Sequence, residues 1–254
     1  MRLAGKVAVV TGAGAGMGRA IAHLFAKEGA KVVLGEIAPD RLETVVQEVR
    51  DAGGDATGVV GNVAKAEDAE ALIQAAIDAY GKIDVLVNNA GIMDLFEGAA
   101  NFKDATYERV MGVNVYGPLA TTRAAVRFMK EHGGGSIVNS ASAAGVGGAA
   151  AGVVYTASKH AVIGITRNTA VTYAPQGIRC NAIAIGAVGD TAIMTGVDMA
   201  KADMEALGQY GKWHALATPL QSIDIANVAL FLASDEAKGV SGAVVTADGG
   251  WTAN

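Results

Sequence analysis

Short apolar runs alternate with longer segments of helical periodicity along most of the chain. The apolar runs are rich in β-branched residues and short enough to be buried strands: 6–10, 31–36, 55–61, 83–91, 135–142, 178–186 and 241–250. The periodic segments between them cover 18–30, 39–54, 65–81, 106–134, 155–177 and 222–235. This alternation predicts an α/β fold, a doubly wound parallel sheet of about seven strands with helices on both faces.

Glycine and proline mark boundaries within this pattern. Gly29 follows the first periodic segment, where a glycine commonly ends a helix. Gly117-Pro118 predicts a bend inside the longest helical stretch. A looser segment covers 187–220, and neither a linker nor a repeat divides the chain, so we expect a single domain over 1–254.

The composition fits a folded protein with a large core. Of 254 residues, 51% are apolar and 18% are charged. The net charge is −5 and no basic run occurs, which argues against nucleic acid or an anionic membrane as a partner. No apolar run approaches the roughly 18 residues of a membrane span.

Two features favour a reducing compartment. Cys180 is the single cysteine, so it cannot form a disulfide within the chain, and its apolar surroundings indicate a small buried side chain. The N-terminal sequence enters a predicted strand almost at once and shows no secretory pattern. We therefore expect a cytoplasmic protein.

Ligands of a doubly wound sheet bind beyond the carboxyl ends of its strands, so the residues there carry the functional signal. The stretch TGAGAGMG, Thr11–Gly18, follows the first strand and opens a helix. Glycines let the backbone approach a pyrophosphate, and a helix N-terminus offers free N–H groups. The alternative is a tight turn without a ligand, because a glycine-rich turn alone is a weak signal.

Glu36 ends the second strand, 18 residues after Gly18. A carboxylate there can accept hydrogen bonds from both ribose hydroxyls of an adenosine, and it repels a 2′-phosphate. Ile37 follows it, and no arginine stands nearby on the strand end. The prediction is NAD(H) rather than NADP(H); the alternative is an ordinary solvated glutamate.

Amides and hydroxyls end the next strands. Asn62, after the third strand, can offer both a donor and an acceptor to an adenine edge. Asn88–Gly91, after the fourth, joins two amides to small residues that suit either close approach of a cofactor or the tying of adjacent strands. The fifth strand ends in Ser140-Ala141-Ser142.

Tyr155 and Lys159 lie four residues apart, about one helical turn, so their side chains share a helix face. A tyrosine has a pKa of about 10, too high for a good base at neutral pH, and an adjacent ammonium favours the phenolate. The alternatives are an accidental surface pair and a packed aromatic ring.

Together these motifs resemble the classical short-chain dehydrogenase/reductase family. They are TG-x₃-G-x-G at Thr11–Gly18, NNAG at Asn88–Gly91, a serine 13 residues before Tyr155, and Y-x₃-K. The likeness extends to the closing stretch GAVVTADGG. It implies a Rossmann-type fold that binds NAD(H), oxidoreduction of a small-molecule alcohol or ketone, and a homotetramer paired through the helices after the fourth and fifth strands.

The family's site residues map onto this chain position by position. The resemblance implies Tyr155 as the acid/base and Lys159 as its electrostatic partner and a ligand of the nicotinamide ribose. It implies Ser142, which the 13-residue spacing selects over Ser140, as the group that holds the substrate oxygen, and Asn114 as the support of a proton-relay water. The implied cofactor-binding residues are Gly12, Gly16, Met17, Gly18, Glu36, Ile37, Asn62, Val63, Asn89, Ala90, Gly91, Tyr155, Lys159, Gly186, Val188 and Thr191.

The chain departs from the family pattern after the sixth strand. Ile185 replaces the family's proline, and Thr191 stands one position late, with Asp190 in the expected place. The backbone of Val188 can still serve the nicotinamide carboxamide, in a loop without proline's restriction of φ. Asn62 stands where the family often has aspartate, and it keeps an acceptor oxygen.

The segment 187–220 matches the family's mobile substrate lid. Small residues at 145–154, together with Met93 and Leu95, face it across the predicted site. We predict a roomy pocket for a neutral, apolar secondary alcohol or ketone; the alternative is ordinary lid packing. The apolar lid residues are Ile193, Met194, Val197, Met199, Met204, Leu207, Tyr210, Trp213 and Leu216.

The main alternative to an enzyme is a non-catalytic NAD(H)-sensing protein on the same fold. Such proteins often lose the tyrosine or the lysine, and this chain keeps both. A methyltransferase also uses a glycine turn and a strand-end acid, but it leaves Tyr155 and Lys159 unexplained. The four histidines form no ligand-spaced cluster with acids or cysteine, so no metal site is predicted.

Overall fold

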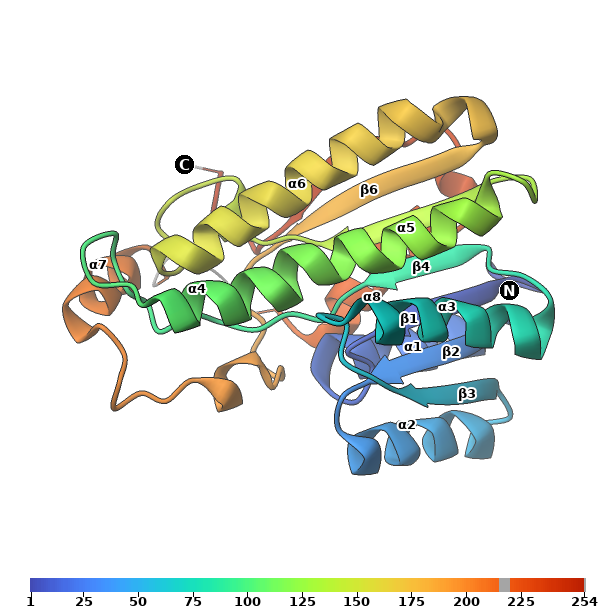
Figure 1. Cartoon of the computed structure of the whole chain (residues 1–254), viewed down its shortest axis with the longest axis horizontal. Helices are drawn as coiled ribbons and strands as arrows, with labels where there is room; N and C mark the ends of the chain where they lie inside the picture. Colours follow the sequence, from blue (N-terminus) through green and yellow to red (C-terminus); the bar gives the residue numbers. More distant parts are fainter. Residues whose placement is uncertain (215–219, 254) are drawn as a thin grey trace.

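The computed structural model describes residues 1–214 and 220–253, and for 211–214 it describes the backbone alone. Within these residues the chain forms a seven-stranded sheet of order β3-β2-β1-β4-β5-β6-β7, in which all neighbouring strands are parallel (Figure 1). This confirms the predicted doubly wound, Rossmann-type sheet. The strands are β1 (Val7–Thr11), β2 (Lys31–Glu36), β3 (Asp55–Val60), β4 (Val85–Asn88), β5 (Gly135–Ser140), β6 (Ile178–Ile185) and β7 (Val244–Ala247).

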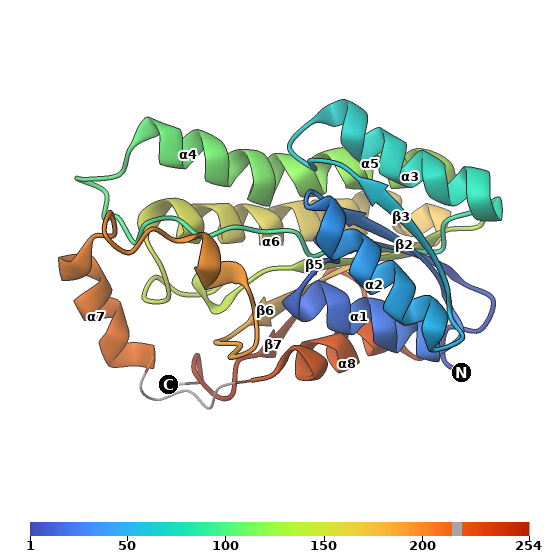
Figure 2. The same cartoon turned by 90° about the horizontal axis from the view of Figure 1, so that it is seen from below.

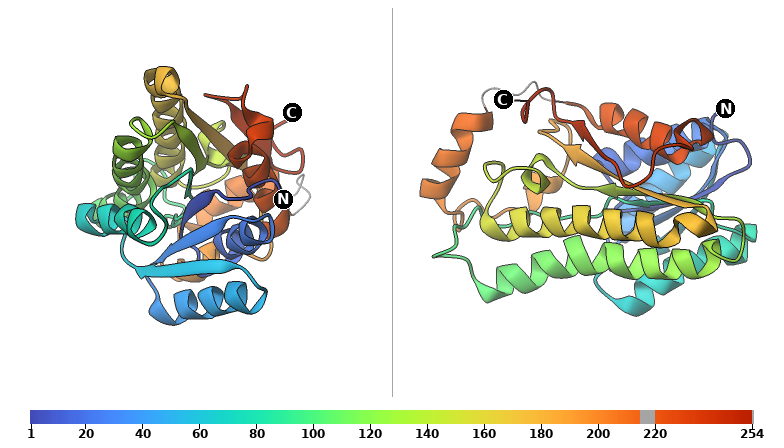
Figure 3. Two further views of the ribbon diagram at one scale, coloured as in Figure 1. Left: turned by 90° about the vertical axis from the view of Figure 1, so that its right-hand side faces the viewer. Right: turned by 90° about the horizontal axis from the view of Figure 1, so that it is seen from above.

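Helices cover both faces of the sheet, as the views in Figures 2 and 3 show. One layer holds α1 (Gly16–Lys27), α2 (Pro39–Asp51) and α8 (Ser222–Ala233). The other holds α3 (Ala66–Tyr80), α4 (Asp104–Met111), α5 (Gly117–Met129) and α6 (Val153–Tyr173). Short 3₁₀ turns occupy Ala143–Gly145, Ala174–Gln176, Ile193–Gly196 and Asp235–Ala237.

Two apolar cores lie on opposite sides of the sheet because successive strand residues point to opposite faces. Ala8 and Val10 of β1 pack into the core under α1, α2 and α8, whereas Val7 and Val9 pack into the core under α3, α5 and α6. Both faces of the central strands are therefore buried, which explains why their sequences are continuous apolar runs.

The long helical stretch contains an irregular turn close to the predicted bend. A π-helical turn, Gly112–Tyr116, joins α4 to α5, and the N–H of Gly117 donates to the carbonyl of Gly112, five residues earlier. Pro118 has no N–H, and its ring would crowd the carbonyl four residues before it, so a wider turn relieves both problems. The irregularity carries Asn114.

The looser segment predicted at 187–220 contains a helix that sequence analysis missed, α7 (Met204–His214). Gly208 and Gly211 lower its intrinsic helix propensity and hid the pattern. Figure 1 shows α7 standing away from the sheet, on the side where the strands end.

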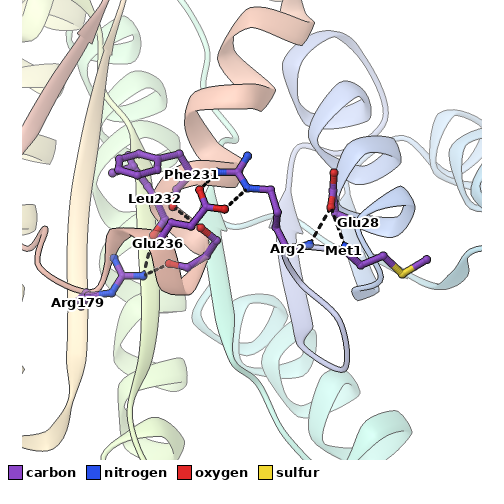
Figure 4. Close-up of polar contacts among 8 residues, drawn as sticks. Met1, Arg2, Glu28, Arg179, Phe231, Leu232 and Glu236 are labelled. Atoms are coloured by element: carbon purple, nitrogen blue, oxygen red, sulfur yellow. Dashed lines mark hydrogen bonds and ion pairs between the residues drawn. The ribbon is translucent and has the colours of Figure 1, made fainter.

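The opposite end of the sheet is tied together by polar contacts of the N-terminus (Figure 4). The backbone N–H of Arg2 donates to Glu28 at 2.7 Å, and its guanidinium pairs with Glu236. Arg179 of β6 donates to the carbonyl of Leu232, at the end of α8, at 2.8 Å. These contacts join α1, α8 and β6 far from the carboxyl edge.

Candidate active site

A cavity of about 650 Å³ opens at the carboxyl ends of the strands. It contains almost all of the residues that the sequence singled out. The predicted residues that line it are Gly12, Met17, Glu36, Ile37, Asn62, Val63, Asn89, Ala90, Gly91, Ser142, Tyr155, Lys159, Gly186, Val188 and Thr191. Gly16, Gly18 and Asn114 are not part of its wall, and their surroundings show why.

The glycines of the β1–α1 turn are required by close packing. Gly12 has φ +62°, and a Cβ there would lie 2.9 Å from the Cα of Ala90. A Cβ on Gly18 would lie 2.0 Å from the carbonyl oxygen of Gly12, so this glycine lets α1 pack on the end of β1. Gly16 has φ +49°, and a Cβ there would lie 3.0 Å from the Oγ1 of Thr191. Gly18 thus shapes the turn without lining the cavity.

Glu36 lies beside this turn. One carboxylate oxygen accepts a hydrogen bond from the N–H of Gly14 at 3.0 Å, and the other accepts from Ile37 at 2.9 Å and Ala38 at 3.1 Å. The strand end itself carries no arginine. Arg41, in the first turns of α2, also lines the cavity, and its Cβ and the Glu36 Cγ both flank Gly14. The start of α2 brings Arg41 to the cavity beside the strand end, and the sequence analysis did not foresee this placement.

Two asparagines at the strand ends differ in whether their side-chain oxygens accept a hydrogen bond. The Oδ1 of Asn62 accepts from Ala64 at 3.0 Å. The Nδ2 of Asn89 donates to the carbonyls of Thr11 and Gly12, at 3.1 and 3.2 Å. The buried Oδ1 of Asn89 has no hydrogen-bond partner among the described residues. A buried acceptor without a donor is costly, so a bound group that donates to this atom would be favoured.

The neighbouring Asn88 has a structural role. Its Nδ2 donates to Asn139 at 2.8 Å and to Thr122 at 3.1 Å, and its Oδ1 accepts from Thr121 at 2.6 Å. These bonds tie β4 to β5 and α5, one of the two readings that the sequence left open for the NNAG motif.

Asn114 is buried in the π-helical turn and clamps the backbone after β4. Its Oδ1 accepts from the N–H of Ile92 at 2.9 Å, and its Nδ2 donates to the carbonyl of Ile92 at 2.9 Å and to Ser158 at 3.1 Å. A Cβ on Gly91 would lie 3.5 Å from both the Asn114 Oδ1 and the Lys159 Nζ. The amide is therefore close to the lysine, although it does not form the cavity wall.

Tyr155 and Lys159 lie in the first turns of α6, with the ammonium nitrogen 5.4 Å from the centre of the phenol ring. Burial raises the pKa of Tyr155 to about 12, with a smaller upward contribution from Asp94, while a hydrogen bond with Ser142 lowers it. Burial also lowers the pKa of Lys159 to about 8. In the protein alone, burial thus makes the phenol less acidic than a free tyrosine.

The fifth strand contributes two serines in different ways. Ser142 caps the following 3₁₀ turn, accepting from Ala144 at 3.1 Å, and shares a hydrogen bond with Tyr155. The Lys159 Nζ donates to the backbone carbonyl of Ser140 at 2.8 Å. Ser140 thus fixes the lysine through its main chain, a contact that no side-chain pattern could predict.

The loop after β6, which lacks the family's proline, is held by contacts with the start of α8. Val188 forms a parallel bridge with Leu220, and Ser222 donates to Asp190 through its N–H and its hydroxyl, both at 2.8 Å. Asp190 therefore anchors the start of α8, while Thr191 lines the cavity.

The lid packs on the phenol side of the cavity. Ile193, Val197, Leu207 and Tyr210 pack on an apolar cluster that includes Tyr155. The same cluster contains Met93, Phe96, Ala144, Ala150 and Ala151, of which Met93, Phe96 and Ala150 line the cavity. The predicted lid residue Leu216 and the side chain of Trp213 lie outside the described residues.

The cavity fits a nicotinamide dinucleotide along its length. Gly12, Glu36 and Asn62 would hold the adenosine end, the unpartnered Oδ1 of Asn89 would meet a donor there, and Tyr155 and Lys159 would reach the other end. In the described part of the chain, no cluster of histidine, cysteine and acidic side chains could hold a metal ion. The described helices include none long and apolar enough to span a membrane.

Fold and site define a nicotinamide-dependent oxidoreductase, and the comparisons give its family. A family model described as enoyl-(acyl carrier protein) reductase matches residues 12–252. The chain is 38% identical to 3beta-hydroxysteroid dehydrogenase 2 of Eggerthella lenta, over 99% of this chain and 96% of the relative. It is 38% identical to a 3-oxoacyl-[acyl-carrier-protein] reductase of Thermotoga maritima, over 98% and 99%.

The solved structure of levodione reductase superposes with a TM-score of 0.91 at 33% identity and 99% coverage of both chains. The protein belongs to the classical short-chain dehydrogenase/reductase family.

Proposed function

We propose that this protein is an NAD(H)-dependent dehydrogenase that interconverts a neutral, apolar secondary alcohol and its ketone. The observation that carries the proposal is the convergence of Ser142, Tyr155 and Lys159 on one wall of a cavity whose far end holds Glu36. Its relatives named for hydroxysteroid, 3-oxoacyl and levodione chemistry support a hydroxyl or keto group as the reacting function.

The chemistry divides between three side chains. The bound dinucleotide supplies the hydride acceptor in oxidation and the hydride donor in reduction. Tyr155 takes the hydroxyl proton of the alcohol at its phenolic oxygen, or returns that proton to the ketone oxygen. Ser142 donates a hydrogen bond to the same substrate oxygen and stabilises its developing charge.

Lys159 makes the phenol usable as a base. Burial raises the pKa of Tyr155 to about 12, so the free protein holds the phenol neutral at physiological pH. A protonated Lys159 beside it, together with the positive charge of an oxidised nicotinamide, favours the phenolate. The carbonyl of Ser140 keeps the ammonium within reach of the phenol.

The substrate half of the cavity supports an apolar ligand. Met93, Phe96, Ile193 and Leu207 line it, and Met194 adds a flexible thioether. Arg109 is also part of the wall, where it donates to the carbonyl of Met93 at 3.1 Å. An acidic substrate is therefore the outcome that would count against the neutral class.

Reduced-nicotinamide absorbance with a panel of secondary alcohols and ketones tests the proposal. We expect turnover of neutral apolar substrates and a loss of about 10³-fold in kcat for Tyr155→Phe. Equal rates in both proteins would reject Tyr155 as the acid/base, and an absence of turnover by the wild type would leave the NAD(H)-sensing alternative. A preference for carboxylated or phosphorylated substrates over every neutral one would reject the proposed substrate class.

Cofactor choice depends on Glu36 and Arg41, which lie side by side at the adenosine end. The carboxylate repels a 2′-phosphate, whereas the guanidinium would attract one. We expect Glu36→Ala to bind NADPH more tightly, because Arg41 is then unopposed. The double variant Glu36→Ala/Arg41→Ala should lose that gain, as measured by quenching of protein fluorescence. An unchanged NADPH affinity in Glu36→Ala would contradict the repulsion argument.

We also propose a homotetramer in the cytoplasm. Leu119 on α5 and Val171 on α6 are exposed apolar residues on the two helices that would pair across an interface. Cys180 is a buried free thiol, which suits a reducing compartment. Light scattering coupled to gel filtration measures the assembly, and a monomer at micromolar concentration would refute it.

A further inference from the structure

The chain between β4 and α4 contains a buried segment that the proposed chemistry does not use. Asp94, Phe96 and Glu97 are each at least 97% buried, and we call residues 94–97 the anchor segment. Figure 2 shows the chain after β4 running along the start of α6 and reaching toward α7. Two acidic side chains buried in one short loop require an explanation, since burial disfavours their charge.

Asp94 binds the first turn of the helix that carries the predicted acid/base. Its Oδ2 accepts from the backbone N–H of Tyr155 itself at 2.9 Å, and the carboxylate also accepts from the N–H of Gly152, the N-cap residue. A Cβ at position 152 would lie 2.5 Å from the Asp94 Oδ2. A glycine at the N-cap therefore lets a carboxylate from another part of the chain do what a capping side chain normally does.

The same segment holds the lid. The carbonyl of Glu97 accepts from Val153 at 2.9 Å, and the carbonyl of Leu95 accepts from Asp203 at 2.9 Å. Asp203 immediately precedes α7, and its own side chain accepts from Ala206 at 3.0 Å. Four consecutive residues thus bind the N-termini of both α6 and α7.

The backbone of the segment is strained where it turns from one helix to the other. Phe96 has φ +59°, a left-handed conformation that is unfavourable for a bulky side chain. Its N–H donates to the Asp94 Oδ1 at 3.0 Å, which holds the turn. Strain of this kind persists only where the surroundings impose it, and it clusters at functional sites.

We propose that Asp94 is a positioning residue that fixes the phenol of Tyr155 and couples it to the lid helix α7 through the anchor segment. The proposal rests on the function of Tyr155 proposed above. Movement of α7 pulls on Leu95, one residue from the carboxylate that holds the Tyr155 backbone. Lid closure over a substrate and alignment of the acid/base would then be one event.

Several titratable groups share this environment. Tyr155 on α6 packs in one cluster with Phe96, and Tyr210 on α7 packs against that cluster. Asp203, just before α7, donates its N–H to Leu95, and Arg109 on α4 donates to the Met93 carbonyl. Burial raises the pKa of both Tyr155 and Tyr210, and the negative charge of Asp94 adds a smaller upward contribution to each. Replacing the carboxylate by an amide should therefore make the phenol of Tyr155 more acidic while it loosens the helix start.

The test compares Asp94→Asn and Asp94→Ala with Glu97→Gln, a control that removes a charge from the same segment and keeps the backbone bond to Val153. We expect about 10²-fold lower kcat in Asp94→Ala, because small displacements of a reacting group have effects of that size. In Asp94→Asn, the acidic limb of kcat/KM for oxidation, where Tyr155 loses its proton, should move to lower pH. Glu97→Gln should keep the wild-type pH profile.

Hydrogen exchange supplies a readout that does not need turnover. We expect both Asp94 variants to exchange faster at 152–155 and at 203–207, with the exchange of β1 and β4 unchanged. Faster exchange in α6 alone would overturn the coupling to the lid. An unshifted pH profile in Asp94→Asn, with Tyr155→Phe inactive, would overturn the inference and leave the proposed function intact. A wild type that turns over no substrate would instead reject the function, while the exchange data still tested the coupling.

Discussion

The wall that carries Tyr155 and the lid that faces it are built in opposite ways. Lys159 is 4% exposed and bonded to a main-chain carbonyl, and Asn114 is buried with three hydrogen bonds. On the lid, Met194 is 44% and Met204 is 61% exposed. This contrast distinguishes groups that must be held in fixed positions from those that need not be. Proton and hydride transfer need groups fixed in place, whereas an apolar substrate needs only a surface that adapts to its shape.

The largest expected effect is on kcat and comes from the wall that carries Tyr155. It distinguishes Ser142 from Ser140. Ser142→Ala should lower kcat by about 10²- to 10³-fold, because it removes the donor that we propose for the developing oxyanion. Ser140→Ala is the matched control, since Ser140 holds Lys159 through its carbonyl and not its hydroxyl. Steady-state kinetics of the two variants test this, and equal losses would contradict the selection of Ser142.

The next effect is on the free energy of unfolding and arises from the buried Lys159. Burial lowers the pKa of Lys159 from 10.5 to about 8, so between these pH values the unfolded chain binds the proton more readily than the folded chain. Stability contributed by this group therefore rises with pH through that window, by up to about 3 kcal/mol. Lys159→Met removes the titration and should lack this rise.

Urea unfolding of both proteins between pH 7 and pH 10 measures the difference. The wild type should gain on the variant as the pH rises. If the free energies of unfolding of the two proteins changed in parallel with pH, the folded protein would keep Lys159 charged without cost. Water would then reach this part of the cavity more than its packing indicates.

The contrast between the wall and the lid also explains what sequence could predict. The order of strands follows from alternating apolar runs, and β2 falls where the pattern put it, at Lys31–Glu36. The glycine turn, Glu36, Ser142, Tyr155 and Lys159 come together at one cavity because the carboxyl ends of parallel strands meet at one edge. Local signals and a simple topology rule were sufficient for these residues.

The features that the sequence analysis missed depend on main-chain contacts or on how separate elements are placed in the fold. The Ser140 carbonyl has no side-chain signature, and Asp94 caps α6 from 61 residues away in the chain. Arg41 lines the cavity together with Glu36 because α2 starts close to the end of β2. The lid helix α7 escaped detection because its glycines weaken the periodic pattern.

Two glycines on helices sharpen the contrast further. A Cβ on Gly18 would meet the Gly12 carbonyl at 2.0 Å, whereas nothing lies within 4 Å of a Cβ on Gly208 in α7. We expect Gly18→Ala to cost about 1–3 kcal/mol of stability, because backbone atoms must shift. Gly208→Ala should stabilise the protein slightly, by up to about 1 kcal/mol, since alanine favours the helix. Thermal unfolding measures both, and equal shifts would contradict the difference between a rigid turn and an open lid.

The smallest effect is expected on the lid itself. Met194 lines the cavity, and Met199, with similar exposure, is not among the residues of its wall. Met194→Ala should raise KM for apolar substrates a few-fold and leave kcat nearly unchanged, because a partly buried thioether contributes about 1 kcal/mol to binding. Met199→Ala should change neither constant. A large fall in kcat for Met194→Ala would place the lid among the groups that align the reaction, and the division between a fixed wall and an adaptable lid would have to be abandoned.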